Sequence, residues 1–214
     1  MLFRSKDIDP ALVSQCRHFH FGYPPLMARM FEDEGSELKK IFQLAKGAGA
    51  ITSCDMSLPD PDSLSGRAPW RRILENVLPW VDFFLPSIEE TFFMLHPKEF
   101  LEMKKHYCNE ELIDHFQPMD YSSLADELLS MGCTLVALKT AHRGFYMKTV
   151  SKEKFRSITD SMPIPVDNWA DRELWAPAYE VDTFGSATGS GDSSIAGLLS
   201  AYLRGTTIEV ALTY

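Results

Sequence analysis

The residues best suited to chemistry form one short stretch near the end of the chain, Thr188-Gly189-Ser190-Gly191-Asp192. A helix is predicted directly after it, because apolar residues recur at helical spacing at Ile195, Leu198, Leu199, Tyr202 and Leu203. A glycine-rich turn that leads into a helix presents unpaired backbone N–H groups and the positive end of the helix dipole, which suits phosphate. A carboxylate is unexpected in a site that only binds anions. We therefore expect Asp192 to take a proton from an attacking hydroxyl group.

Other glycine-rich motifs do not fit this stretch. No Lys-Ser or Lys-Thr follows the last glycine, so the stretch is not a Walker A loop. The third glycine of a dinucleotide-binding loop and the central serine of a nucleophile elbow are also missing. The plain alternative is a turn without chemistry, in which Asp192 caps the helix N-terminus. On these residues alone both interpretations stay open.

The elements that must position this stretch alternate along the chain. Apolar patterning predicts strands near residues 16–22, 50–55, 81–85, 134–138 and 145–147, the last of them antiparallel to its predecessor. Helical spacing predicts helices near residues 37–47, 69–78, 86–95, 100–107, 121–131 and 195–203. Strands that alternate with helices indicate an α/β fold with a mainly parallel sheet between helices. For residues 151–178 the pattern predicts no particular helices or strands.

Further candidate residues fall where the predicted strands end. Because ligands of parallel sheets bind beyond the carboxyl ends of the strands, we expect these residues to lie at one edge. They are Asp55, Ser87 to Glu90, Lys139-Thr140 and the turn at Gly189 to Asp192. His18 and His20 share one face of the first predicted strand, but no third metal ligand is visible, so we interpret both as structural.

Composition limits the kind of protein. The chain has 214 residues, a formal net charge of −9, 45% hydrophobic and 24% charged residues, which is ordinary for a globular protein. The negative charge argues against nucleic acid or an anionic membrane as the main partner. The cysteines are widely spread, so we expect reduced thiols: Cys16, Cys54, Cys108 and Cys133. No signal peptide or apolar run of membrane-spanning length is visible, so we expect a cytoplasmic protein.

The glycine-rich stretch, read from Ala187 to Asp192, resembles the C-terminal signature of the ribokinase/PfkB carbohydrate kinase family, Asp-Thr-x-Gly-Ala-Gly-Asp. Ser186 and Ala187 stand in place of the leading Asp-Thr, and Ser190 replaces the alanine. The resemblance implies a ribokinase-like three-layer fold. It also implies that Asp192 is the catalytic base and that the backbone N–H groups of Gly189, Ser190, Gly191 and Asp192 form the anion hole.

Two earlier segments extend the resemblance. Residues 52–57 look like the family's strand that ends in Asp-x-Asn, which makes Asp55 a candidate for substrate contact or a loop cap. Residues 80–90 look like the segment that carries the family's Asn-x-x-Glu motif, with Ser87 in place of the asparagine. Glu90 then matches the acidic residue associated with Mg²⁺ and phosphate. The alternative for Glu90 is a charge at a helix N-terminus, worth about 0.3–1 kcal/mol.

A third segment, residues 136–144, resembles the strand and turn that contact nucleotide phosphates. The resemblance assigns Lys139, Thr140 and Gly144 to these phosphates, although Ala141 replaces an expected glycine. The alternative for Lys139 is a solvated lysine at a strand end.

Together the resemblance implies transfer of the γ-phosphoryl group of ATP to a hydroxyl of a sugar or sugar-like substrate, with Mg²⁺ near Glu90. A homodimer is a possible assembly of such a protein. Two alternatives remain: a non-catalytic nucleotide- or sugar-binding or regulatory relative that kept the fold, and an unrelated α/β enzyme with another phosphate ligand. We expect residues 1–214 to form one domain. It would lack the family's N-terminal substrate segment and C-terminal nucleotide-pocket segment, and so be a poor enzyme alone.

Overall fold

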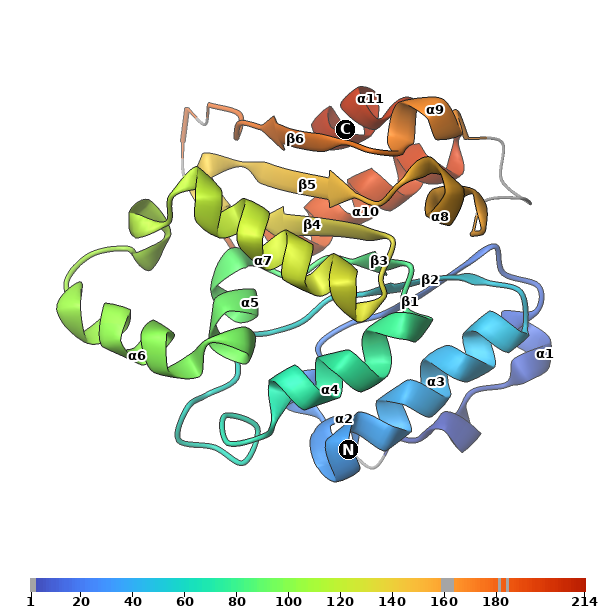
Figure 1. Ribbon diagram of the computed structural model, residues 1–214, viewed down its shortest axis with the longest axis horizontal. Coiled ribbons are helices and arrows are strands. Elements are labelled where there is room, and N and C mark those ends of the chain that lie inside the picture. Colours follow the sequence, from blue (N-terminus) through green and yellow to red (C-terminus); the bar gives the residue numbers. More distant parts are fainter. Residues whose placement is uncertain (1–2, 159–163, 181, 184) are drawn as a thin grey trace.

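A six-stranded sheet forms the centre of the computed structural model, which describes residues 3–158, 164–180, 182–183 and 185–214 (Figure 1). The strands lie side by side in sequence order: β1 His18–Phe21, β2 Ile51–Cys54, β3 Phe83–Phe84, β4 Leu135–Lys139, β5 Phe145–Thr149 and β6 Glu173–Ala176. Strands β1 to β4 are parallel, while β5 and β6 are antiparallel to their neighbours. The carboxyl ends of the parallel strands therefore meet at one edge of the sheet.

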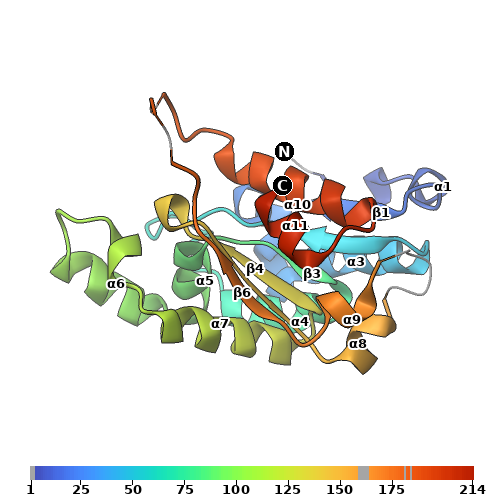
Figure 2. The ribbon, with the colours of Figure 1, turned by 90° about the horizontal axis from the view of Figure 1, so that it is seen from above.

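Helices cover both faces of this sheet (Figure 2). The crossovers between parallel strands turn in the same sense, which places their helices on one face. These helices are α3 Ser36–Gly47, α4 Trp70–Val77, α5 Ile88–Leu95 and α7 Pro118–Met131, with α6 Pro97–His106 beside them. The other face is covered by α10 Ser190–Leu203 and α11 Ile208–Thr213, and by α8 Lys152–Arg156 and α9 Val166–Trp169. Two short helices, α1 Pro10–Val13 and α2 Ala28–Phe31, flank β1 in sequence.

The alternation of side chains along the strands divides the interior into two cores. In β4, Val136 and Leu138 pack in the core beneath α3 to α7, while Leu135 and Ala137 pack in the core beneath α10 and α11. Successive strand residues point to opposite faces, so a strand buried on both sides must be apolar throughout. The predicted three-layer α/β fold with a mainly parallel sheet is confirmed.

The amino end of the sheet is fastened by a buried carboxylate, Asp82, just before β3. The residue is 4% exposed. Its carboxylate accepts hydrogen bonds from Thr52 N at 2.9 Å and from Lys46 Nζ at 2.7 and 2.9 Å. The hydroxyl of Thr52 lies 3.1 Å from the same carboxylate. One acidic side chain thus joins α3, β2 and β3.

The structure corrects several boundaries. The strand predicted over residues 81–85 is regular only at Phe83–Phe84, although Asp82 N and Leu85 N also donate to carbonyls of β2. Residues 151–178, for which no order was predicted, contain α8, α9 and β6, apart from residues 159–163, which lie outside the described part. The last helix is capped by Thr207, whose hydroxyl accepts from Val210 N, and not by Thr206 as its spacing to Glu209 suggests.

Membrane spans were sought among the helices of the described residues. None of these helices is both long enough and apolar enough to cross a bilayer.

Candidate active site at the carboxyl ends of the strands

The glycine-rich stretch forms the predicted turn into α10. Gly189 is the N-cap residue and has φ of +80°, a conformation that glycine adopts without strain. The helix begins at Ser190, so Asp192 is its third residue and makes no capping hydrogen bond. The interpretation of Asp192 as the helix N-cap is therefore wrong. The carboxylate of Asp192 is exposed beside the first turn of the helix.

The backbone N–H groups of this turn are not all equally available. The N–H of Ser190 already donates to the Ala187 carbonyl at 3.1 Å. Within the described part of the chain, no acceptor is found for the N–H groups of Gly191 and Asp192. These two belong to the first turn of α10, where the helix itself offers no partner. The predicted anion hole therefore rests on Gly191 and Asp192 more than on Ser190.

Lys139 reaches this turn from the end of β4. A Cβ atom placed on Gly191 would lie 3.4 Å from Lys139 Cδ and 3.8 Å from Lys139 Nζ, so the lysine stem packs directly on the glycine. Its ammonium group forms an ion pair with Asp55, which follows β2. The lysine side chain is only 16% exposed, so it is not the solvated lysine of the alternative interpretation.

Asp55 is the more deeply buried partner of that pair. The residue is 1% exposed, and its carboxylate also accepts from Met56 N at 2.8 Å. Burial raises the pKa of Asp55 above its ordinary value, although the ammonium of Lys139 acts in the opposite direction. A buried carboxylate with a perturbed pKa at a strand end is typical of a functional site.

Glu90 lies at the start of α5 and has a structural partner there. Its carboxylate accepts from Ser87 N at 2.7 Å, and the Ser87 hydroxyl accepts from Glu90 N at 3.2 Å, which completes a capping box. Burial raises the pKa of Glu90, Lys139 lowers it and Asp55 raises it further. The helix-capping interpretation of Glu90 is thus met, while its charge also acts on the residues of the strand ends.

Thr140 and Gly144 close the turn between β4 and β5. The N–H and hydroxyl of Thr140 both donate to the Gly144 carbonyl, at 2.9 and 2.6 Å. Gly144 has φ of +106°, and a Cβ there would lie 2.0 Å from the carbonyl oxygen of Ala176. Both residues therefore fix the backbone of this turn. Their contact with nucleotide phosphates stays a prediction.

Sequence analysis missed Tyr23, whose hydroxyl donates to Asp192 Oδ1 at 2.5 Å. This hydrogen bond, more than burial or the negative charges of Asp192, Asp55 and Glu90, raises the pKa of Tyr23 to about 12. Tyr23 follows β1 and has φ of +58°, an uncommon conformation for a residue with a side chain. Its place in a turn after the first strand, at the edge where ligands bind, was the available signal.

The two histidines of β1 also belong to this region. His18 and His20 both hydrogen-bond to the hydroxyl of Ser53 on the neighbouring strand. The charges of Asp55, Lys139 and Asp192 all influence the pKa of His20. The interpretation of His20 as merely structural therefore overlooked its position beside the predicted site residues.

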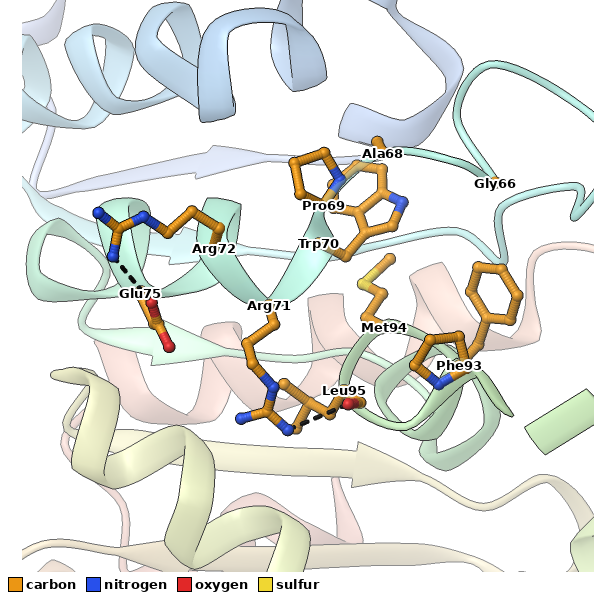
Figure 3. A pocket seen from close by; sticks show the side chains of 11 residues that line it. Gly66, Ala68, Pro69, Trp70, Arg71, Arg72, Glu75, Phe93, Met94 and Leu95 are labelled. Carbon is orange, nitrogen blue, oxygen red and sulfur yellow. Dashed lines mark hydrogen bonds and ion pairs between the residues drawn. The ribbon is translucent and has the colours of Figure 1, made fainter. Parts of the chain in front are cut away.

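A cavity of about 390 Å³ lies elsewhere, where α4 begins and α5 ends (Figure 3). Its walls are mostly apolar, with Trp70, Phe93 and Met94 among them. Its arginines are engaged, since Arg71 pairs with Glu127 and Arg72 pairs with Glu75. None of the candidate residues lines this cavity. The candidate residues therefore lie at the strand ends, away from this cavity.

Comparison with solved structures identifies the architecture. A PfkB protein from Polaromonas sp. JS666 aligns over 98% of this chain with a TM-score of 0.62 and 20% sequence identity. The chain has the ribokinase-like fold. A ribokinase II from E. coli, solved with ATP and Mg²⁺, aligns over 99% of the chain with a TM-score of 0.61 and 18% identity. Arabidopsis thaliana ribokinase, solved with ribose and ATP, aligns over 99% of the chain with a TM-score of 0.61 and 14% identity.

The ribokinase-like fold is shared over only part of these proteins. The aligned region covers 54% of the Polaromonas chain, 53% of the E. coli chain and 50% of the Arabidopsis chain. This chain thus spans about half the length of the solved structures that it matches. No family model and no curated protein matches the sequence. The ribokinase-like fold that the glycine-rich signature predicted is confirmed by structure alone.

Proposed function

We propose that this chain carries the catalytic turn of an ATP-dependent kinase that phosphorylates a hydroxyl group of a sugar or sugar-like acceptor. Asp192 is the general base, and the N–H groups of Gly191 and Asp192 stabilise the charge of the migrating phosphoryl group. Such transfer depends mainly on positioning and on electrostatic stabilisation, which a rigid helix start next to a strand edge supplies.

One observation carries this proposal. Asp192 Oδ1 already accepts a hydrogen bond from a hydroxyl group, that of Tyr23, at 2.5 Å. A general base must lie within hydrogen-bond reach of the proton that it removes, and the contact with Tyr23 supports the proposal because a hydroxyl group can reach this carboxylate. The phenol occupies the position where we place the hydroxyl of the acceptor. The acceptor must therefore displace the Tyr23 hydroxyl before Asp192 can act.

The other charged residues of the strand edge have complementary tasks. Lys139 packs on Gly191 and faces the turn, so its ammonium group attracts nucleotide phosphates to the helix start. Asp55 accepts hydrogen bonds and is the residue we assign to acceptor binding. When a phosphate draws Lys139 away, the Asp55 carboxylate loses its present partner and turns to a hydroxyl of the acceptor.

The side chains present fit a magnesium ion. Mg²⁺ prefers oxygen ligands and is usually held by one or two carboxylates together with substrate phosphates. Glu90 supplies such an oxygen, and Asp55 is near enough for its charge to raise the pKa of Glu90. A bound Mg²⁺ would neutralise phosphate charge. Within the described residues no cluster of three His, Cys, Asp or Glu side chains is found, so the phosphates would complete the site.

The test is the substitution Asp192→Asn in the purified chain. We expect phosphoryl transfer to fall about 10²–10⁴-fold, the usual contribution of a general base, while nucleotide affinity changes by no more than a few-fold. Transfer is measured with ATP against pentoses, hexoses, nucleosides and sugar phosphates. Asp62→Asn, in an exposed loop, is the matched control. Near-normal turnover of the Asp192 variant would overturn the assignment of the base.

A second candidate function is a nucleotide- or sugar-binding protein without turnover. It is favoured because several polar groups of the site already bind one another: Lys139 pairs with Asp55, Ser190 N donates to Ala187, and Glu90 accepts from Ser87 N. Isothermal titration distinguishes the two functions. Nucleotide binding without transfer to any acceptor of the panel would favour the binding protein.

A further inference from the structure

One serine hydroxyl connects two imidazole rings at the sheet edge. Ser53 Oγ lies 2.7 Å from His18 Nε2 and 2.7 Å from His20 Nδ1. The three side chains come from adjacent strands: His18 and His20 are two residues apart on β1, and Ser53 pairs with His20 across the β1–β2 ladder. This His18–Ser53–His20 chain leads from the interior toward the strand ends.

The hydroxyl has a single proton, and this limits the arrangement. The oxygen could accept an N–H from both rings, but Ser53 is 0% exposed and no other acceptor for its proton is found in the described residues, so Ser53 donates to one ring and accepts an N–H from the other. Either His18 donates to Ser53 and Ser53 donates to His20, or the direction of both hydrogen bonds is reversed. A neutral imidazole carries its proton on only one nitrogen. The direction of the two hydrogen bonds through Ser53 therefore fixes the tautomer of both rings.

His18 decides the direction. Its other nitrogen, Nδ1, is buried and has no hydrogen-bond partner in the described part of the chain. In the reversed arrangement a neutral His18 would carry its proton on this nitrogen, and a buried N–H without an acceptor is rarely tolerated. His18 therefore donates from Nε2 to Ser53, and Ser53 donates to His20 Nδ1. The proton of His20 then lies on Nε2.

The free nitrogen of His20 faces the end of its strand. A Cβ atom on Gly22 would lie 3.8 Å from His20 Nε2, so this nitrogen points along β1 toward the turn that carries Tyr23. Burial lowers the pKa of His20 below its ordinary value. The charges that act on it from the neighbouring elements are Asp55 and Asp192, which raise this pKa, and Lys139, which lowers it. His20 is thus neutral at pH 7 and offers one N–H donor.

We propose that His20 is an acceptor-binding residue that donates a hydrogen bond from Nε2 to an oxygen of the phosphoryl acceptor. This inference rests on the proposed function and names a further residue of the same site. Asp55 and Asp192 can only accept hydrogen bonds while ionised, whereas a hydroxyl-bearing acceptor also needs donors. Lys139 is directed to a carboxylate or to phosphate. A neutral donor with a fixed tautomer supplies the missing contact without an added charge.

The tautomer is tested first, because it does not depend on catalysis. In the ¹⁵N-labelled chain, two-bond proton–nitrogen correlations of the imidazole rings report which nitrogen carries the proton. We expect His20 in the Nε2–H form at pH 7, its signals identified by their loss in His20→Gln. Ser53→Ala should allow a mixture of the two His20 tautomers. His106, an exposed histidine of α6, is the reference. An Nδ1–H form of His20 in the unsubstituted chain would overturn the proposal.

Acceptor binding is tested with two matched substitutions. The amide nitrogen of Gln reaches the position of His Nε2, whereas that of Asn reaches only the position of Nδ1. We expect His20→Asn to raise the KM for the acceptor about tenfold, as for one lost hydrogen bond, and His20→Gln to change it by less than about threefold. The KM for ATP should stay unchanged in both variants. Equal effects of the two variants, or an effect on ATP alone, would overturn the proposal.

Failure of the proposed function has a different signature. If the unsubstituted chain phosphorylates no acceptor of the panel, the panel is titrated into the ¹⁵N-labelled chain and the His20 Nε2 resonance is followed. A shift on addition of a sugar or nucleoside supports His20 as a binding residue even without turnover. No shift with any acceptor would overturn the proposal.

Discussion

Two buried aspartate–lysine pairs lie at opposite ends of β2 and differ in how well the aspartate is satisfied. At the amino end, Asp82 accepts from Lys46 at both carboxylate oxygens and from Thr52 N, and the Thr52 hydroxyl, which also lies 2.8 Å from the Trp80 carbonyl, is 3.1 Å away. At the carboxyl end, Asp55 accepts from Lys139 and from a single backbone N–H, that of Met56. Burial raises the pKa of Asp55 despite the nearby ammonium group.

Under the proposed function, this difference separates a structural pair from one that binds a ligand. A buried charge with several donors on secondary structure joins elements and has no capacity left for a ligand. A buried charge with few donors is costly to the fold, and such costs concentrate where a ligand completes the hydrogen bonds. Both aspartates are buried, and the placement of their donors distinguishes them: both oxygens of Asp82 have donors, whereas those found for Asp55 in the described residues reach Oδ1.

Asp82→Asn should have the largest effect on stability. The amide keeps one acceptor oxygen, which can serve Thr52 N, but it presents an NH₂ group where Lys46 donates to Oδ1, and the ammonium group loses its counter-charge. Breaking a buried ion pair costs about 3–5 kcal/mol, and we expect the lower end, about 3 kcal/mol, because the Lys46 side chain is 28% exposed. Urea unfolding measures the loss. A change below about 1 kcal/mol would show that the amino-end pair is not structural.

His18 extends the comparison to pH, because its ring lies between the two ends of β2: it pairs with Ile51 across the β1–β2 ladder and hydrogen-bonds to Ser53. Burial, assisted by the charge of His20, lowers the pKa of His18 to about 4. The folded chain therefore favours the neutral ring. Its contribution to stability is present above pH 6.5 and is lost as the pH falls through 6.5 toward 4, by about 2–3 kcal/mol.

The control for this effect is His18→Gln, which keeps an N–H donor toward Ser53 but does not titrate. Urea unfolding of both proteins at pH 7 and pH 4.5 gives the difference in acid sensitivity. An identical loss of stability in the two proteins between these pH values would contradict the role of His18.

Asp55→Asn tests the carboxyl end with the same substitution as Asp82→Asn. Because the pKa of Asp55 is raised, the folded chain binds the proton more tightly, and this carboxyl weakens the fold as the pH rises above 3.8. The neutral amide removes this cost but leaves the Lys139 ammonium without its carboxylate, so the two effects oppose each other and we expect a smaller loss of stability at pH 7 than for Asp82→Asn. Acceptor binding should weaken about tenfold, as for loss of a hydrogen bond to a charged group.

For Asp55→Asn, urea unfolding and the KM for the acceptor are measured together. A loss of stability as large as that of Asp82→Asn would mean that both pairs are structural. Unchanged acceptor binding would remove Asp55 from the site.

Glu90→Gln should have the smallest effect on the fold. Glutamine at this position can still accept from Ser87 N, so the capping box is kept and stability should change by less than about 0.5 kcal/mol. If the charge of Glu90 organises Mg²⁺, the Mg²⁺ concentration for half-maximal transfer should rise about tenfold. An equal loss of activity at every Mg²⁺ concentration, with a lower melting temperature, would leave only the capping role.

Much of the fold could be predicted from local patterns. The apolar stripe of α3, Leu38, Ile41, Phe42 and Ala45, is buried as its spacing requires. Gly189 and Gly205 have positive φ where the turn before α10 and the end of that helix require it. Strand β4 was found because it is an apolar run bounded by turn residues. No helix or strand was predicted in residues 151–178, because α8, α9 and β6 are short and depend on contacts with the rest of the fold.

The sequence alone determined the glycine-rich turn, Asp192 at the start of a helix and the parallel order that brings strand ends to one edge, since each depends on residues adjacent in the chain. Only the tertiary structure decided which side chains meet there. Tyr23 and Asp192 are 169 residues apart, and Lys139 and Asp55 are 84 apart, so no local pattern joins them. The tautomer of His20 likewise depends on Ser53, which lies beside it only because β1 and β2 pair in this register.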